Sequence, residues 1–142
     1  LMCLKVFVKG RADKFEALKH GARKLGSAFQ KINFLRDIGS DHSERGRSYF
    51  PGVMISTFNE HEKHNIEEEI RMEFEEAYDG IKGLPIGSRL GVYVAYRYYM
   101  QLLNRLTKVS ASNILKERFR VSDAMKIYIL VKSIIRHRFR FI

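Results

Sequence analysis

Two aspartates one helical turn apart, Asp37 and Asp41, lie in a segment whose polar residues could bind a charged ligand. At 100° per residue, Gln30 and Asn33 fall on the same helical stripe as this pair. Two carboxylates at i and i+4 repel each other, and the negative end of a helix dipole adds to that penalty. Mg²⁺ removes both penalties, and it commonly takes one or two protein carboxylates and completes its shell with water and substrate phosphate. The stripe therefore predicts Mg²⁺ ligands at Asp37 and Asp41, with the two amides placed to orient a ligand.

Cationic and hydroxyl side chains surround the aspartate pair in the sequence: Arg36, Arg45, Arg47 and Tyr49. Guanidinium groups form paired hydrogen bonds to phosphate oxygens, so a diphosphate is expected beside the metal. A solvated helix end is the alternative interpretation, because a D-x-x-x-D spacing is common on helices. The amides on the same stripe and the nearby arginines favour the binding site.

The composition indicates one globular unit with a strong positive charge. The 142 residues are 45% hydrophobic and 30% charged, and the formal net charge is +10. Positions 60–79 hold nine of the sixteen acidic residues, whereas positions 86–142 hold twelve Lys and Arg against two acidic residues. No apolar run reaches the ~20 residues of a membrane span, and the single cysteine, Cys3, cannot form an internal disulfide. We therefore expect a cytoplasmic protein with an anionic partner.

Apolar residues recur at steps of three and four through most of the chain, which is the period of a helix. This period predicts helices over about 13–41, 59–82, 88–108, 110–120 and 122–139, with a loop over 48–58. The expected residues at the helix starts are Asp13, Asn59, Ser88, Ser110 and Ser122. The predicted fold class is all-α, with about five helices in a single domain over residues 1–142.

The segment AFQKINFLRDIGSD, followed by RGRSYFP, closely resembles the second aspartate-rich region of the squalene and phytoene synthases. In that family the pattern is Q-x-x-N-x-x-R-D-x-x-x-D and then R-x-Y-x-P. The opening LMCLKVF is similar to the element before this helix, and AYRYYMQLLNRL is similar to a late helix that carries a tyrosine. The resemblance runs over essentially the whole chain.

This resemblance implies the isoprenoid synthase fold and an enzyme that joins two prenyl diphosphates head to head, with phytoene synthase as the favoured branch. It implies substrates such as geranylgeranyl or farnesyl diphosphate, and two or more Mg²⁺ ions in the intact site. NADPH is not an expected cofactor, although the sequence leaves its use open. The roles implied residue by residue are metal ligands at Asp37 and Asp41, cavity residues at Gln30, Asn33 and Tyr99, and a diphosphate-side group at Arg45, Arg47 and Tyr49.

One departure from the family bears on the extent of the chain. The family uses two aspartate-rich motifs on facing helices, and this sequence holds no second D-x-x-x-D helix. Family members are also about twice as long. We therefore expect the C-terminal portion of a larger synthase domain, with the N-terminal half as its partner. Such a portion is not expected to catalyse alone, and it would expose apolar helix faces meant for absent helices.

Two other functions remain compatible with the residues. A basic all-α module can bind nucleic acid, but no recognition motif is present and the paired aspartates oppose a phosphate backbone, so nucleic acid is not an expected partner. A non-catalytic helical subunit that completes a site with a partner is the other alternative.

The basic amphipathic last helix either lies on an anionic membrane surface or packs on the core with a solvated edge, and packing is the preferred interpretation.

We expect several histidines and tyrosines outside the stripe to have structural positions and no role in the chemistry. His61 and His64 are expected on a solvated helix face, since no third ligand of the H-E-x-x-H type accompanies them. His42 is expected to be a loop histidine. Tyr93 and Tyr96 are expected to be packing residues.

Overall fold

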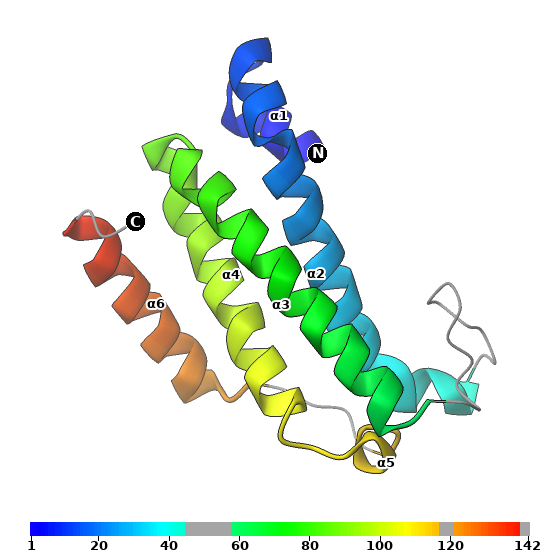
Figure 1. Ribbon diagram of the computed structural model, residues 1–142. Coiled ribbons are helices and arrows are strands. Elements are labelled where there is room, and N and C mark those ends of the chain that lie inside the picture. Colours follow the sequence, from blue (N-terminus) through cyan, green and yellow to red (C-terminus); the bar gives the residue numbers. More distant parts are fainter. Residues whose placement is uncertain (45–57, 117–120, 140–142) are drawn as a thin grey trace.

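The computed structural model describes residues 1–44, 58–116 and 121–139, and for residues 39–44 it describes the helical backbone. Six helices account for these ranges: α1 (Met2–Phe7), α2 (Ala12–Glu44), α3 (Glu60–Gly83), α4 (Ile86–Leu106), α5 (Ala111–Ile114) and α6 (Asp123–Arg138). The long helices α2, α3 and α4 lie side by side, α6 lies along the outer side of α4, and α1 and α5 lie at opposite ends (Figure 1). These ranges contain no strand, which confirms the all-α prediction.

Several predicted helix boundaries need correction. The opening apolar run forms a separate short helix, α1, because Lys9 and Gly10 adopt positive φ angles of 52° and 73° and turn the chain before α2. Asp13 lies in the first turn of α2 and is not its cap. Pro85 precedes α4, which begins two residues before Ser88. The predicted helix over 110–120 is a single turn, Ala111–Ile114, in the part of the chain that is described.

The predicted start of α3 is confirmed in atomic detail. The side-chain Oδ1 of Asn59 accepts hydrogen bonds from the backbone N–H groups of His61 and Glu62, at 2.9 and 3.0 Å. These bonds satisfy donors that have no partner within the helix, which stabilises a helix start by about 1 kcal/mol. Ser110 and Ser122 occupy the predicted cap positions of α5 and α6 but form no side-chain capping bond.

The apolar stripes predicted from the sequence meet in one core between α2, α3, α4 and α5. Ile32, Leu35, Ile70, Leu102 and Leu103 are completely buried there. Fully burying a side chain of this size contributes about 1.5–3 kcal/mol, so this core fixes how the long helices pack. The face of α2 that carries Ile32 and Leu35 is therefore turned inward, and the opposite face is left for the polar stripe.

A polar seam fixes the register of α2 against α3. Lys31 Nζ lies 2.6 Å from Glu69 Oε1 and 2.9 Å from Glu73 Oε1, and the Ser27 hydroxyl donates to the same Glu73 oxygen at 2.9 Å. Burial works against the charged form of Lys31, but its hydrogen bonds to Glu69 and Glu73 raise its pKa on balance. Because ionic groups this buried are costly without partners, a shift of one turn between the helices would be strongly penalised.

Two glycines let α2 and α3 approach closely near their crossing. A Cβ atom added to Gly21 would lie 3.2 Å from the Cα of Gly80, and one added to Gly80 would lie 3.3 Å from the Cα of Gly21. Both distances are to backbone, which cannot move as a flexible side chain can. The glycines therefore set the separation of the two helices at the wall of a pocket described below.

Candidate functional site

The polar stripe of α2 lies on the side of the helix away from the core. Asn33 and Asp37 are half-buried and Gln30 is exposed, whereas Ile32 and Leu35 on the opposite side are fully buried. The helix continues through position 41, so Asp41 follows Asp37 by one turn of the same helix. The predicted spacing of the two aspartates along one helix is therefore present.

Tyr99 of α4 connects this stripe to the aromatic residues between the helices. Its hydroxyl donates a hydrogen bond to Oδ1 of Asn33, with 3.3 Å between the two oxygens. Its ring stacks on Phe29, with the ring centroids 4.0 Å apart and the planes 18° from parallel. Tyr98 meets the Tyr99 ring edge-on at 5.5 Å. The structure therefore brings Asn33 and Tyr99 together, two residues that are 66 positions apart in sequence.

Arg36 binds the neighbouring carboxylate through both arms of its guanidinium group. Nε lies 2.9 Å from Asp37 Oδ1, and Nη2 lies 2.6 Å from Asp37 Oδ2. Hydrogen bonding to Asp37 is the largest effect on the Arg36 guanidinium and raises its pKa. Both side chains are 22% exposed, so this pair is partly shielded from water. A positive charge already lies beside the oxygens that the sequence assigns to a metal ion.

Only some of the other predicted site residues lie among the residues that the structure describes. Gln30 lies on the stripe but makes no hydrogen bond among those found in the described residues. Arg45, Arg47 and Tyr49 lie outside the described residues. The described side chains contain no cluster of three or more His, Cys, Asp or Glu groups arranged for a metal ion. The stripe thus offers carboxylate ligands from a single helix. This number suits a Mg²⁺ ion that takes one or two ligands from the protein and the others from water and substrate phosphate.

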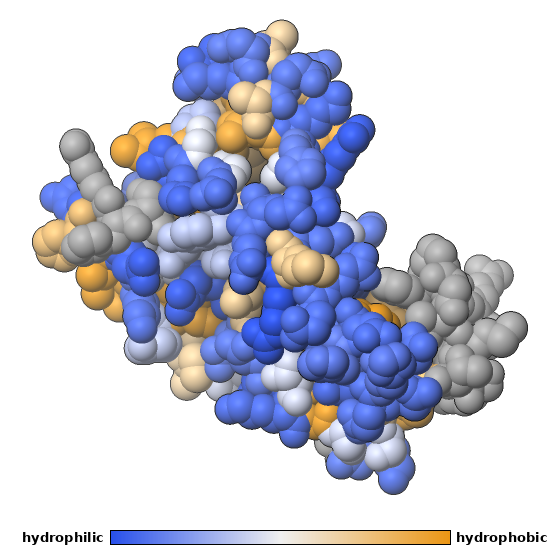
Figure 2. Space-filling view, in the orientation of Figure 1, coloured by the Kyte–Doolittle hydropathy of each residue, from blue (hydrophilic) through white to orange (hydrophobic). Residues whose placement is uncertain are grey.

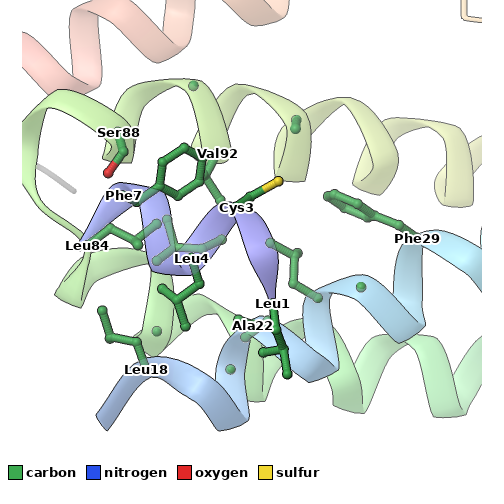
Figure 3. A pocket seen from close by; sticks show the side chains of 18 of the residues that line it. Leu1, Cys3, Leu4, Phe7, Leu18, Ala22, Phe29, Leu84, Ser88 and Val92 are labelled. Carbon is green, nitrogen blue, oxygen red and sulfur yellow. The ribbon is translucent and has the colours of Figure 1, made fainter. Parts of the chain in front are cut away.

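An apolar pocket of about 570 Å³ opens beside Phe29. Helices α1, α2, α3 and α4 all contribute to it, and Cys3, Phe7 and Phe29 lie around its interior (Figure 3). Its lining is mostly small or apolar, with Gly21, Ala22, Leu25, Ala77, Gly80, Ile81, Gly91, Val92 and Ala95 among the residues involved. Because Phe29 both lines the pocket and stacks on Tyr99, the pocket adjoins the polar stripe.

Sequence reasoning missed this pocket and the part that α1 plays in it. The signal available in the sequence was the recurrence of glycine and alanine on the inner faces of three helices, which leaves space where larger side chains would fill the contact. The structural interpretations of two histidines and two tyrosines outside the stripe are confirmed. His61 and His64 are exposed, and Tyr93 is buried between Tyr78 and Tyr96. Burial raises the pKa of Tyr96, as expected for a packing residue. The loop position predicted for His42 is wrong, because α2 continues through Glu44 and includes position 42.

The helical architecture and the aspartate-bearing α2 are those of the all-α isoprenoid synthase class. Within that class the chain belongs to the squalene/phytoene synthase family, whose model matches residues 1–124. The chain is 31% identical over 120 residues to phytoene synthase 1 of the Zea mays chloroplast, covering 73% of this chain and 29% of that protein. It is 30% identical over 128 residues to a chloroplastic phytoene synthase of an Oncidium hybrid cultivar, covering 79% of this chain and 30% of that protein. The chain thus spans about 30% of the length of these relatives, and no solved structure matches it.

Proposed function

We propose that this chain supplies the C-terminal part of a phytoene synthase-like enzyme that joins two prenyl diphosphates head to head. The observation that carries the proposal is the contact of Tyr99 with both Asn33 and Phe29. A prenyl diphosphate has an anionic head and a long apolar tail, and it needs a polar site directly beside an apolar one. Tyr99 and Phe29 lie at that boundary, with the stripe on one side and the pocket on the other.

Asp37 and Asp41 would hold Mg²⁺. Arg36 would then release its hydrogen bonds to Asp37 and form them to a diphosphate oxygen instead. Bound Mg²⁺ supplies the charge neutralisation that lets an allylic diphosphate leave. The bidentate geometry of Arg36 on a carboxylate suits phosphate equally well, so the same group can serve both partners in turn. Arg45, Arg47 and Tyr49 remain proposed diphosphate ligands on the strength of their order in the sequence.

The pocket would hold a prenyl tail and exclude water from the cation left when the carbon–oxygen bond breaks. A volume of about 570 Å³ is within the roughly 300–1,000 Å³ range of small-molecule sites. Aromatic faces attract positive charge, and the stacked rings of Phe29 and Tyr99 are close to the polar stripe where that charge would form. Gln30 and Asn33 would orient the reacting groups with their amides. We propose geranylgeranyl or farnesyl diphosphate as the substrate class.

Turnover would require a second polypeptide segment that carries the other aspartate-rich helix. Among the described residues, Gln30 is exposed and Asn33 and Asp37 are half-buried, so this part of the stripe keeps a solvent-facing side that such a segment could contact. Adding the upstream polypeptide of a longer relative should therefore restore turnover that the chain lacks alone.

Ligand-dependent stabilisation tests the proposal without requiring turnover. Mg²⁺ together with an unreactive prenyl thio-diphosphate should raise the midpoint of thermal unfolding by several degrees, since a ligand at 100 times its Kd stabilises by about 2.7 kcal/mol. Asp37→Asn should abolish the rise, whereas Asp79→Asn, an exposed acid on α3 that pairs with Lys82, should retain it. An unchanged midpoint in the parent chain would count against the proposal. Salt-sensitive binding to random DNA that Asp37→Asn leaves intact would favour the nucleic-acid alternative instead.

A further inference from the structure

One guanidinium group binds both oxygens of the Asp37 carboxylate. Arg36 Nε lies 2.9 Å from Asp37 Oδ1, and Arg36 Nη2 lies 2.6 Å from Asp37 Oδ2. Paired hydrogen bonds between an arginine and a carboxylate are among the stronger polar contacts in proteins, because both partners are charged and their geometries match. The oxygens assigned to Mg²⁺ are therefore also the oxygens that Arg36 binds.

The pair lies beside the contact between α2 and α4. Asn33 precedes it by about one turn of α2 and accepts a hydrogen bond from Tyr99. Both Arg36 and Asp37 are 22% exposed, so water screens this pair less than it screens a pair on the open surface. Hydrogen bonding to Asp37 raises the pKa of Arg36, and the nearby Tyr99 and Tyr98 contribute to the same shift. The guanidinium therefore stays charged and close to the carboxylate.

A second pair of an arginine and a carboxylate gives a contrast on the open surface. Arg71 Nε lies 3.9 Å from Glu68 Oε1, and these side chains are 40% and 55% exposed. Both lie on α3, which hydrophilic side chains largely cover in the view of Figure 2. Exposed pairs contribute little to stability, so Arg71 has no comparable hold on its carboxylate.

Arg36 and a metal ion compete for Asp37. A Mg²⁺ ion about 2.1 Å from one carboxylate oxygen would lie roughly 5 Å from a guanidinium that kept its hydrogen bonds to the same carboxylate. At that separation the two positive charges repel enough to weaken metal binding by about tenfold, even with the dielectric constant of water. The alternative is that Arg36 gives up its ion pair, which also costs free energy. In both cases Arg36 lowers the affinity of Asp37 for Mg²⁺ alone.

A diphosphate removes this penalty because it gives the guanidinium another anion. Phosphate oxygens accept the same paired hydrogen bonds as a carboxylate, and they also complete the shell of a Mg²⁺ ion. Arg36 can therefore turn from Asp37 to the diphosphate and keep an ionic partner. Asp37 is then able to bind the metal without a guanidinium on the same oxygens.

We propose that Arg36 makes the binding of Mg²⁺ at Asp37 depend on a bound diphosphate. Arg36 acts as a positioning residue: it holds the carboxylate until the ligand arrives, and it then holds the ligand. This role of Arg36 rests on the proposed function, since it requires Asp37 to be a metal ligand, and it adds a coupling between metal and diphosphate. Because such coupling is reciprocal, the metal strengthens diphosphate binding by the same factor.

Titration of the 142-residue chain with Mn²⁺, followed by electron paramagnetic resonance, tests this role without requiring turnover. Mn²⁺ takes the same oxygen ligands as Mg²⁺, and the binding that Asp37→Asn retains accounts for ions bound elsewhere. Without diphosphate, Arg36→Gln should bind Mn²⁺ about tenfold more tightly than the parent chain. Arg36→Lys keeps the charge but cannot form the paired hydrogen bonds, so it should bind about threefold more tightly. Arg71→Gln, the matched control, removes the same charge from an exposed pair and should change the affinity by less than about twofold.

Inorganic diphosphate should reverse the order of the two proteins. The parent chain should bind the complex of Mn²⁺ and diphosphate at least about tenfold more tightly than Arg36→Gln does, because the guanidinium of the parent chain pairs with the phosphate oxygens. Isothermal titration calorimetry measures both affinities. Equal affinities of the two proteins for this complex would overturn the coupling.

Three results with Mn²⁺ alone also overturn the role assigned to Arg36. One is binding that Asp37→Asn loses but that Arg36→Gln leaves at the parent affinity, and the metal site would then stand without the coupling. Another is tighter binding in Arg36→Gln with parent-like binding in Arg36→Lys, which would show an effect of charge without the paired hydrogen bonds. The third is equal binding by the parent chain and Asp37→Asn, which would overturn the proposed metal site itself.

Discussion

The hydroxyl of Tyr99 donates a hydrogen bond to Oδ1 of Asn33 across 3.3 Å, and this contact ties α4 to the polar stripe of α2. Tyr99→Phe removes the bond and keeps the ring that stacks on Phe29. We expect a loss of about 0.5–1.5 kcal/mol in the free energy of unfolding, measured by urea denaturation. A double-mutant cycle with Asn33→Ala should give a coupling energy of similar size. A coupling energy of zero would show that the two side chains do not interact in solution.

The close approach of α2 and α3 predicts opposite effects at two glycines. Gly80→Ala places a methyl group against the backbone of Gly21 and should destabilise the chain by about 1–3 kcal/mol. Gly26→Ala meets no atom within 4 Å and lies inside α2, so it should stabilise the chain by about 0.5–1 kcal/mol through helix propensity. Thermal unfolding of both variants checks the pair. Destabilisation of equal size at the two positions would contradict the described helix crossing.

Lys31 should be essential to the polar seam because it neutralises a buried carboxylate. Lys31→Met leaves Glu73, which is 7% exposed, with the Ser27 hydroxyl as its described partner, and should cost about 3 kcal/mol. Glu73→Gln in the same chain should recover part of the loss, since the uncompensated charge is gone. Lys19→Met, which breaks an exposed pair with Glu16, should cost no more than about 0.5 kcal/mol. Equal losses for Lys31→Met and Lys19→Met would indicate that Glu73 is hydrated.

Stability should depend on acid pH through Glu76. Hydrogen bonds from Lys24 and then from His20 lower the pKa of Glu76 below its ordinary value of 4.5. A carboxyl whose pKa is lower when folded stabilises the protein fully above pH 4.5 and loses that contribution as the pH falls through the lowered pKa. The difference in thermal midpoint between the parent chain and Glu76→Gln should therefore shrink below pH 4.5. Because Glu76 is exposed, added salt should also reduce the difference, and a difference that grows in acid would contradict this assignment.

The long elements of the fold could be predicted because their sequence signals are local. The apolar stripe of α3 follows directly from residue spacing, and Ile66, Ile70, Phe74 and Ala77 are all buried as expected. Asn59 likewise caps α3 through bonds within three residues. The start of α4 was not predicted, because Pro85 and not Ser88 precedes its first residue. The apolar period also predicted a longer helix after Ser110 than the single turn Ala111–Ile114.

The candidate site was predictable only in part, since half of it depends on contacts between distant segments. The helical spacing of Asn33, Asp37 and Asp41 can be calculated from the sequence, whereas the hydrogen bond to Tyr99 requires α2 and α4 to pack at one register. The pairing of Arg36 with Asp37 also depends on a side-chain conformation that spacing does not specify. The pocket needs four helices and a close glycine contact, so no single stretch of sequence encodes it.

Cys3 provides the most direct measurement of the central claim, that the pocket and the adjoining stripe bind a prenyl diphosphate. It is the one cysteine of the chain, it is exposed, and it lines the pocket. Saturating Mg²⁺ and prenyl thio-diphosphate should slow its alkylation by a maleimide at least about tenfold, whereas inorganic diphosphate should not, because it has no tail to fill the pocket. The same analogue concentration should fail to protect Cys3 in Asp37→Asn. An alkylation rate in the parent chain that the prenyl analogue leaves unchanged would contradict the claim.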